Sequence, residues 1–218
     1  MKKILQLLIC FGVFSCGNSS EEKSIITSET KKVFDEKEVN LPKQDTSMYN
    51  VAILIMNGVY NTELTAPYDI FQHTIFRKQI KPMRVFTVAN TLEPITSFEG
   101  MRILPDANYL DDKLPQIDIL VVPSAEHHLD TDLEDEAMLD FVRGVSREAL
   151  FITSHCDGAF VLAKAGLLRG KVCTTFPTDI DTMKQMFPDL DIRKDVLFVH
   201  DGKFITSAGG AKSFEAAL

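Results

Sequence analysis

Short apolar runs alternate with helical patterns from residue 51 to residue 206. A continuous apolar run at 51–56 (VAILIM) is typical of a strand buried on both faces. The next segment, 63–76, carries apolar residues at helical spacing and predicts a helix. Similar patterns predict strands at 85–89, 119–123 and 149–153, helices at 134–146 and from about Asp157, and a hairpin of strands 196–199 and 203–206. This alternation predicts an α/β fold with a mainly parallel sheet and helices on both faces, whose ligands bind beyond the carboxyl ends of the strands.

The first 15 residues have the pattern of a secretory signal. Two lysines precede an apolar run at 4–14, which is far shorter than the roughly 20 residues that span a bilayer. The run ends in VFSC at 13–16, which resembles the bacterial lipobox, whose cysteine receives diacylglycerol. We therefore predict a signal peptide at 1–15, lipidation of Cys16 and a location in the bacterial cell envelope, with the domain facing the periplasm or the exterior. A plain secretory signal is the alternative.

Residues 16–48 have the composition of a flexible tether. Acidic residues and lysines interleave in this segment with little apolar spacing, which is typical of a solvated chain. We expect the globular domain to span 49–218.

Charge and cysteine spacing narrow the class of function. The 218 residues include 23 Lys and Arg against 31 Asp and Glu, a net charge of −8, and removal of the two leader lysines leaves 21 − 31 = −10. Phosphate backbones are bound by clustered cations, so we expect no nucleic-acid partner. The four cysteines form neither a CxxC pair nor a zinc-finger spacing with histidine, so we expect neither a metal nor a cofactor.

The strongest local signal is FITSHCDGAF at 151–160. Cys156 stands at an abrupt junction of strand and helix, with the small residues Gly158 and Ala159 after it, which is the pattern of a nucleophile elbow. We expect the N-terminus of the following helix to lower the pKa of the thiol and give it thiolate character. The alternative is a buried structural cysteine, because free cysteines are often buried.

Motifs on both sides of this junction resemble the ThiJ/PfpI family, which has a flavodoxin-like, class I glutamine amidotransferase-like fold. The resemblance runs from about residue 51 to the end, and it rests on ELTAP at 63–67, LVVP at 120–123, CDGAFVLAKAGLLRG at 156–170, TTFP at 174–177 and DGKFITSAGG at 201–210. It implies that Cys156 is the reactive residue and that Glu63 hydrogen-bonds to it.

The chain departs from the family pattern at two places near the cysteine. Many members carry a histidine twenty positions after the cysteine, where this chain has Phe176, whose ring cannot accept a proton. After the third strand, Pro123-Ser124-Ala125 stands in place of Pro-Gly-Gly, whose backbone helps to form the oxyanion hole. We expect the backbone N–H groups of Asp157 and Ala125 to hold the developing anion.

Three histidines are candidate replacements for the missing imidazole. His155 adjoins Cys156, but neighbouring residues of a strand point to opposite faces. His127 and His128 follow the third strand on a loop that we expect to border the pocket, with a merely exposed polar loop as the alternative. We expect Cys173, which lies in an apolar stretch, to be a buried structural residue.

The resemblance implies a cysteine-dependent hydrolase, hydratase or glyoxalase-type lyase that acts on a small electrophilic substrate. Cys156 would be the nucleophile and Glu63 the proton relay. The alternative, which Phe176 favours, is a non-enzymatic binding or redox-sensing domain in which Cys156 is oxidised reversibly. The expected partners are a small-molecule substrate and, through the N-terminal lipid, a membrane. The sequence leaves open whether the chain forms a homodimer.

Overall fold

A seven-stranded sheet forms the centre of the structure, a computed structural model that describes residues 47–110 and 113–218. These residues belong to one unit, Val39–Leu218. The predicted signal peptide at 1–15, the lipidation site Cys16 and the predicted tether up to residue 46 lie outside the described residues. In the part of the chain that is described, no helix has the length and apolar character to cross a membrane.

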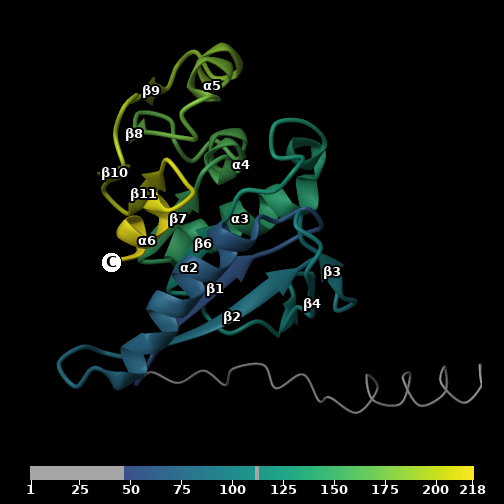
Figure 1. Ribbon diagram of the computed structural model, residues 1–218, viewed down its shortest axis with the longest axis vertical. Helices are drawn as coiled ribbons and strands as arrows, with labels where there is room; N and C mark the ends of the chain where they lie inside the picture. The colour runs from purple at the N-terminus through teal and green to yellow at the C-terminus, as the bar shows by residue number, and fades with distance from the viewer. Residues whose placement is uncertain (1–46, 111–112) are drawn as a thin grey trace, which may run out of the picture. The chain divides into compact units, whose positions relative to one another are not determined.

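The strands of the main sheet lie in the order β10-β11-β7-β6-β1-β2-β5 (Figure 1). Neighbouring strands are parallel except for β10 and β11, which are antiparallel. The prediction of a mainly parallel sheet is confirmed. The strands are β1 (Tyr49–Leu54), β2 (Met83–Ala89), β5 (Ala107–Asn108), β6 (Ile119–Val122), β7 (Phe151–His155), β10 (Phe198–Asp201) and β11 (Phe204–Ser207).

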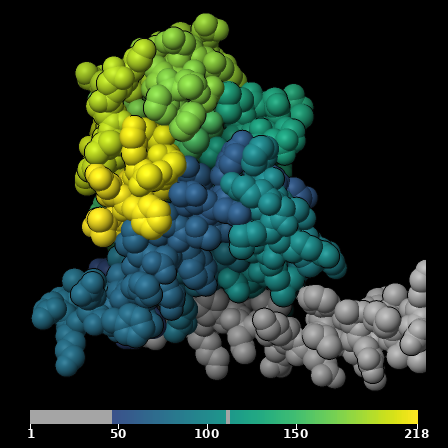
Figure 2. Space-filling model, viewed as in Figure 1, coloured from purple at the N-terminus to yellow at the C-terminus, as the bar shows by residue number. Residues whose placement is uncertain are grey.

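Helices cover both faces of this sheet, because alternate residues of β1 pack into different cores. Ala52 and Leu54 pack in a core with residues of α3 and α4. Val51 and Ile53 pack in a second core with residues of α2 and α6. Figure 2 shows the C-terminal residues lying against the residues of α2. The helices are α2 (Asn61–Gln72), α3 (Glu136–Glu148), α4 (Gly158–Lys164), α5 (Ile180–Met186) and α6 (Lys212–Ala217), with 3-10 turns η1 (His73–Phe76) and η2 (Thr131–Glu134).

Two short strand pairs lie outside the main sheet. One is the antiparallel pair β3 (Ile95–Thr96) and β4 (Arg102–Ile103), and the other is the parallel pair β8 (Val172–Cys173) and β9 (Asp191–Ile192). These two-residue strands are too short to leave a periodic pattern, so the sequence did not indicate them.

The predicted boundaries shift where helix and strand meet. The strand expected at 149–153 begins at Phe151, because the N–H of Ala149 still donates to the carbonyl of Val145 at the end of α3 (3.0 Å). The predicted hairpin is present as β10 and β11, with Gly202 at φ +65° in its turn. Its second strand pairs in parallel with β7, so the hairpin extends the main sheet.

Candidate active site

Cys156 lies between the last residue of β7 and the first residue of α4, at the carboxyl edge of the sheet. Its φ of +55° is in the left-handed region, where a residue with a side chain carries a strain of about 1 kcal/mol or more. Its backbone N–H donates to the carbonyl of Ser207 at the end of β11 (3.0 Å). The chain therefore makes the sharp turn from strand to helix that the sequence predicted, and it places Cys156 beside the ends of β7 and β11.

Two glycines make room for this turn. A Cβ atom on Gly209 would lie 2.3 Å from the Cβ of Cys156, and a Cβ atom on Gly158 would lie 2.0 Å from the carbonyl oxygen of Val122. Non-bonded atoms do not approach this closely. Gly209 therefore lets the chain after β11 pass against Cys156, and Gly158 lets α4 begin against the end of β6.

The thiol of Cys156 is nearly enclosed, because only 8% of the residue is exposed. Its S–H donates to the carboxylate of Asp157, with 3.7 Å between Sγ and Oδ2. Burial raises the pKa of the thiol far above its usual range, and the charges of Asp157 and Glu63 raise it further. The expected thiolate character is therefore wrong: α4 has only seven residues, and burial beside two carboxylates outweighs the effect of its N-terminus.

The side chain of Asp157 is a functional group that the sequence reasoning missed, since it considered only the backbone N–H of this residue. Its Oδ1 accepts a hydrogen bond from the hydroxyl of Thr175 (2.9 Å), and the N–H of Phe176 also donates to the carboxylate. Burial raises the pKa of Asp157 to about 6, and the charge of Asp179 adds to the rise. A carboxyl group with this pKa is ionised near neutral pH and can accept the proton of Cys156.

Glu63 enters the site from the first turn of α2 and is 4% exposed. Its Oε1 accepts from the N–H of Gly210 (2.5 Å), and its Oε2 accepts from the hydroxyl of Ser213 (2.5 Å). Burial raises the pKa of Glu63. The resemblance implied a hydrogen bond between Glu63 and Cys156; both carboxylate oxygens instead have other donors, and the thiol donates to Asp157. Glu63 acts on Cys156 through its charge and joins the C-terminal segment to α2.

The predicted oxyanion hole needs a correction at Ala125. The N–H of Ala125 donates to Nδ1 of His128 (3.2 Å), so it is not free to bind an anion. The N–H of Asp157, in contrast, favours the thiolate form of Cys156. The hydroxyl of Ser124, which is fully buried, also hydrogen-bonds to the sulfur and favours the thiolate. Ser124 and Asp157 therefore supply the donors that face the sulfur.

The three candidate histidines have partners of their own. His128 is fully buried, and burial lowers its pKa to about 3. His155 is 1% exposed, its Nδ1 lies 3.1 Å from the hydroxyl oxygen of Ser207, and burial lowers its pKa to about 4. His127 is about half exposed, with its Nδ1 3.4 Å from Asp130. The thiol of Cys156 therefore has carboxylate neighbours, and the buried imidazoles are neutral near pH 7.

Cys173 lies in the larger core and is fully buried. Burial raises the pKa of its thiol to about 12, with a further contribution from the charge of Asp191. Its position is that of a buried structural residue. Over residues 47–110 and 113–218, no three or more His, Cys, Asp or Glu side chains gather in a way that could hold a metal ion.

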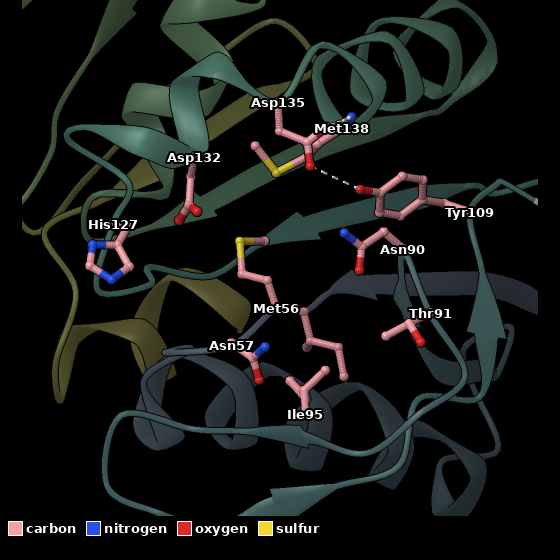
Figure 3. A pocket seen from close by; sticks show the side chains of 11 residues that line it. Met56, Asn57, Asn90, Thr91, Ile95, Tyr109, His127, Asp132, Asp135 and Met138 are labelled. Atoms are coloured by element: carbon pink, nitrogen blue, oxygen red, sulfur yellow. Dashed lines mark hydrogen bonds between the residues drawn. The ribbon is translucent and has the colours of Figure 1, made fainter.

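A separate cavity of about 220 Å³ opens at the carboxyl ends of β1 and β2 (Figure 3). Met56 and Asn90 line it from these two strand ends, and His127 and Asp132 line it from the loop after β6. The prediction that His127 borders a pocket thus applies to this cavity, which Cys156 does not line.

Known proteins are similar to this chain over the same residues. The model of the DJ-1/PfpI family matches residues 49–218. An isonitrile hydratase from Pseudomonas putida is 30% identical over 168 residues, which are 77% of this chain and 68% of that protein. Protein DJ-1alpha from Drosophila melanogaster is 27% identical over 179 residues, 80% of this chain and 77% of that protein. The solved structure of a ThiJ/PfpI family protein from Pseudomonas syringae, 24% identical, covers 83% of this chain and 74% of its own with a TM-score of 0.66, which shows a shared fold.

Proposed function

The chain belongs to the DJ-1/PfpI family, and we propose that it is a cysteine-dependent hydratase for small neutral electrophiles of the isonitrile class. The observation that carries the proposal is the hydrogen bond from the thiol of Cys156 to the carboxylate of Asp157, whose pKa of about 6 suits a base near neutral pH. The similarity to an isonitrile hydratase supports the substrate class.

The proposed reaction begins when Cys156 gives its proton to Asp157. The thiolate forms an S–C bond with the terminal carbon of R–N≡C, and this carbon takes the proton from Asp157, which gives the thioimidate R–N=CH–S–Cys. Water then adds to the same carbon and the C–S bond breaks. One water proton goes to nitrogen and the other returns to sulfur, so the product is the formamide R–NH–CHO and the net change is the addition of one water molecule.

Two donors next to the sulfur serve the addition of water. The hydroxyl of Ser124 and the N–H of Asp157 already favour negative charge on Cys156. Donors that are fixed before the reaction stabilise charge as it develops, because they need no reorganisation. Glu63 is a positioning residue, since it holds Gly210 and Ser213 rather than the sulfur.

Acidic groups around the thiol favour a neutral substrate. Burial raises the pKa of Tyr60, and the charges of Cys156, Glu126, Asp157 and Glu99 raise it further, which indicates a negative potential at this ring. An anionic substrate would be repelled at a site that is partly shielded from water. An isonitrile carries no net charge and avoids this repulsion.

The test is turnover of an aryl isonitrile by the purified full chain, with the formamide product followed by mass spectrometry. Cys156→Ser should abolish turnover, and Asp157→Asn, which keeps the shape but cannot accept the proton, should slow it by about 10²-fold or more. Asp181→Asn, an exposed carboxylate in the first turn of α5, is the matched control and should leave the rate unchanged. Turnover that persists in Cys156→Ser would overturn the proposal.

Redox sensing by Cys156 is the second candidate function. Phe176 favours it, because the thiol has no imidazole at this position to serve as its base. In this role a peroxide would oxidise Cys156 to a sulfenic acid that a second thiol later reduces. Sulfenic acid that dimedone traps at Cys156, together with no turnover of isonitriles, nitriles or aldehydes, would favour sensing over hydration.

A further inference from the structure

The cavity at the ends of β1 and β2 lies where sheets of this kind commonly bind ligands. The chain passes from β1 to β2 on one side and later returns to β6 on the other side of β1, so the end of β1 is the switch point of the sheet. Met56 contributes to the cavity from β1, Asn90 from β2 and Asp132 from the loop after β6. The site of Cys156 is built at the ends of β7 and β11, so the cavity is a second, distinct place.

Two acidic side chains line the cavity. They are those of Asp132 and Asp135, and the lining holds neither Lys nor Arg among the described residues. Asp135 is already bonded, because its Oδ1 accepts from the N–H of Met138 (3.0 Å) and its Oδ2 accepts from the hydroxyl of Tyr109 (3.4 Å, Figure 3). The side chain of Asp132 is only partly buried: 22% of it is exposed, while its Oδ2 is buried, lies 3.8 Å from Nε2 of His128 and has no hydrogen-bond partner in the described part of the chain. A ligand in the cavity would therefore reach the exposed part of this carboxylate.

The imidazole nearest to Asp132, that of His128, carries no positive charge that could neutralise this carboxylate. Nε2 of His128 lies 3.8 Å from Oδ2 of Asp132, but His128 is fully buried and its low pKa keeps it neutral. Its Nδ1 accepts from the N–H of Ala125, which assigns the single ring proton to Nε2. His127, which also lines the cavity, lies against the exposed carboxylate of Asp130. The charge of Asp132 is therefore only partly compensated.

Apolar side chains line the cavity together with these carboxylates. They are Ile55, Ile95 and the thioethers of Met56 and Met138, and Figure 3 shows Met138 beside Asp135. Figure 3 shows the carboxylate of Asp132 and the amide of Asn90 directed toward the same space as these apolar groups. The combination suits a small amphiphilic molecule with a polar, positively charged head.

We propose that this cavity binds a small primary ammonium compound with a short apolar chain. The ammonium group pairs with the carboxylate of Asp132 and hydrogen-bonds to Asn90, and the chain lies against Met56 and Ile95. A volume of about 220 Å³ is below the range of drug-sized sites, so the ligand is small. Anions are excluded by the two carboxylates, since no described Lys or Arg lines the cavity to offset them.

Calorimetric titration of the full chain with three probes of one length tests the proposal. The probes are n-butylammonium, 1-butanol and butyrate, which differ in the charge of the head group. We expect one n-butylammonium to bind per chain at least about tenfold more tightly than 1-butanol, and butyrate not to bind. Asp132→Asn should weaken the binding of n-butylammonium by about tenfold or more and should leave the affinity for 1-butanol within about twofold of the wild-type value.

Two further variants locate the ligand. Asn90→Lys changes an exposed residue on the cavity wall and should also expel n-butylammonium, because it brings a like charge to the site. Asp130→Asn removes an exposed carboxylate outside the lining and should leave the affinity unchanged. Equal affinity for n-butylammonium and 1-butanol, or unchanged binding in both Asp132→Asn and Asn90→Lys, would overturn the proposal. If Asp157→Asn were the one variant that lost binding, the ammonium would bind at the thiol site instead, and this result would also overturn the proposal.

Discussion

At the scale of single residues, we expect Asp157 to set the pH at which Cys156 can react. Burial raises the pKa of Asp157 to about 6, so below that pH the carboxyl group is protonated and cannot accept the thiol proton. We expect isonitrile turnover to rise as the pH increases through about 6. In Asp157→Asn, the rate should no longer rise through pH 6. If the plots of rate against pH show the same inflection in both proteins, another group is the base.

The same raised pKa predicts how stability depends on pH. The carboxyl group of Asp157 has an ordinary pKa of 3.8 and a folded-state pKa of about 6, so its contribution favours folding fully below about pH 4 and is lost as the pH rises through 6. The shift of about two units corresponds to up to about 3 kcal/mol. Between about pH 4 and pH 7, the wild type should lose up to that much unfolding free energy relative to Asp157→Asn. Urea denaturation at both pH values measures it, and parallel changes in the two proteins would contradict it.

Local patterns revealed the strand-to-helix turn that holds Cys156, but the sequence did not reveal the partners of its thiol. Cys156 could be predicted because the strand, the small residues and the helix that make its turn are adjacent in the chain. Side-chain directions depend on the left-handed φ of Cys156 and on contacts from distant segments, such as that of Thr175 with Asp157. For the same reason, the pairing of Ala125 with His128 was not visible, although both residues lie in one short loop.

At the scale of elements, the packing of α4 against β6 depends on the missing side chain of Gly158. An added Cβ would lie 2.0 Å from the backbone oxygen of Val122, and neither α4 nor β6 can easily move away. Gly158→Ala should therefore lower the free energy of unfolding by about 1–3 kcal/mol or more. Gly144 in α3 is the matched control, because no atom lies within 4 Å of its added Cβ. Gly144→Ala should stabilise by about 0.5–1 kcal/mol. Thermal denaturation compares them, and a Gly158→Ala protein as stable as the wild type would mean that α4 can shift away from β6.

Helices and strands with a long, regular pattern of apolar residues could be predicted from the sequence, and short elements without such a pattern could not. β1 and α2 were visible because a doubly buried strand gives a continuous apolar run and a helix on one face gives a 3.6-residue period. The two-residue strand β5 and the parallel pairing of β11 with β7 were not visible, since they depend on contacts between distant segments. Strand order, and with it the place of the switch point, is likewise a tertiary property.

At the scale of the whole domain, one loop after β6 serves two sites on the same edge of the sheet. Ser124 borders the thiol of Cys156, whereas Asp132 lines the cavity beyond β1. His128 joins the two ends, because its Nδ1 accepts from Ala125 and its Nε2 lies 3.2 Å from Sδ of Met56 in the cavity wall. A ligand in the cavity and a substrate at the thiol would therefore contact the same short segment.

At the scale of the whole chain, we predict that attachment to a membrane depends on Cys16. The apolar run at 4–14 is too short to span a bilayer, so a lasting anchor would have to come from acyl chains, which contribute about 0.8 kcal/mol for each buried methylene. We expect a clickable fatty acid to label the wild type and not Cys16→Ala, and we expect the unlabelled variant to leave the membrane fraction. Cys10→Ala, which removes the other cysteine of the leader, is the matched control and should keep the label. A label that persists in Cys16→Ala and is lost in Cys10→Ala would instead place the lipid within the apolar run, and the segment would then be retained rather than cleaved.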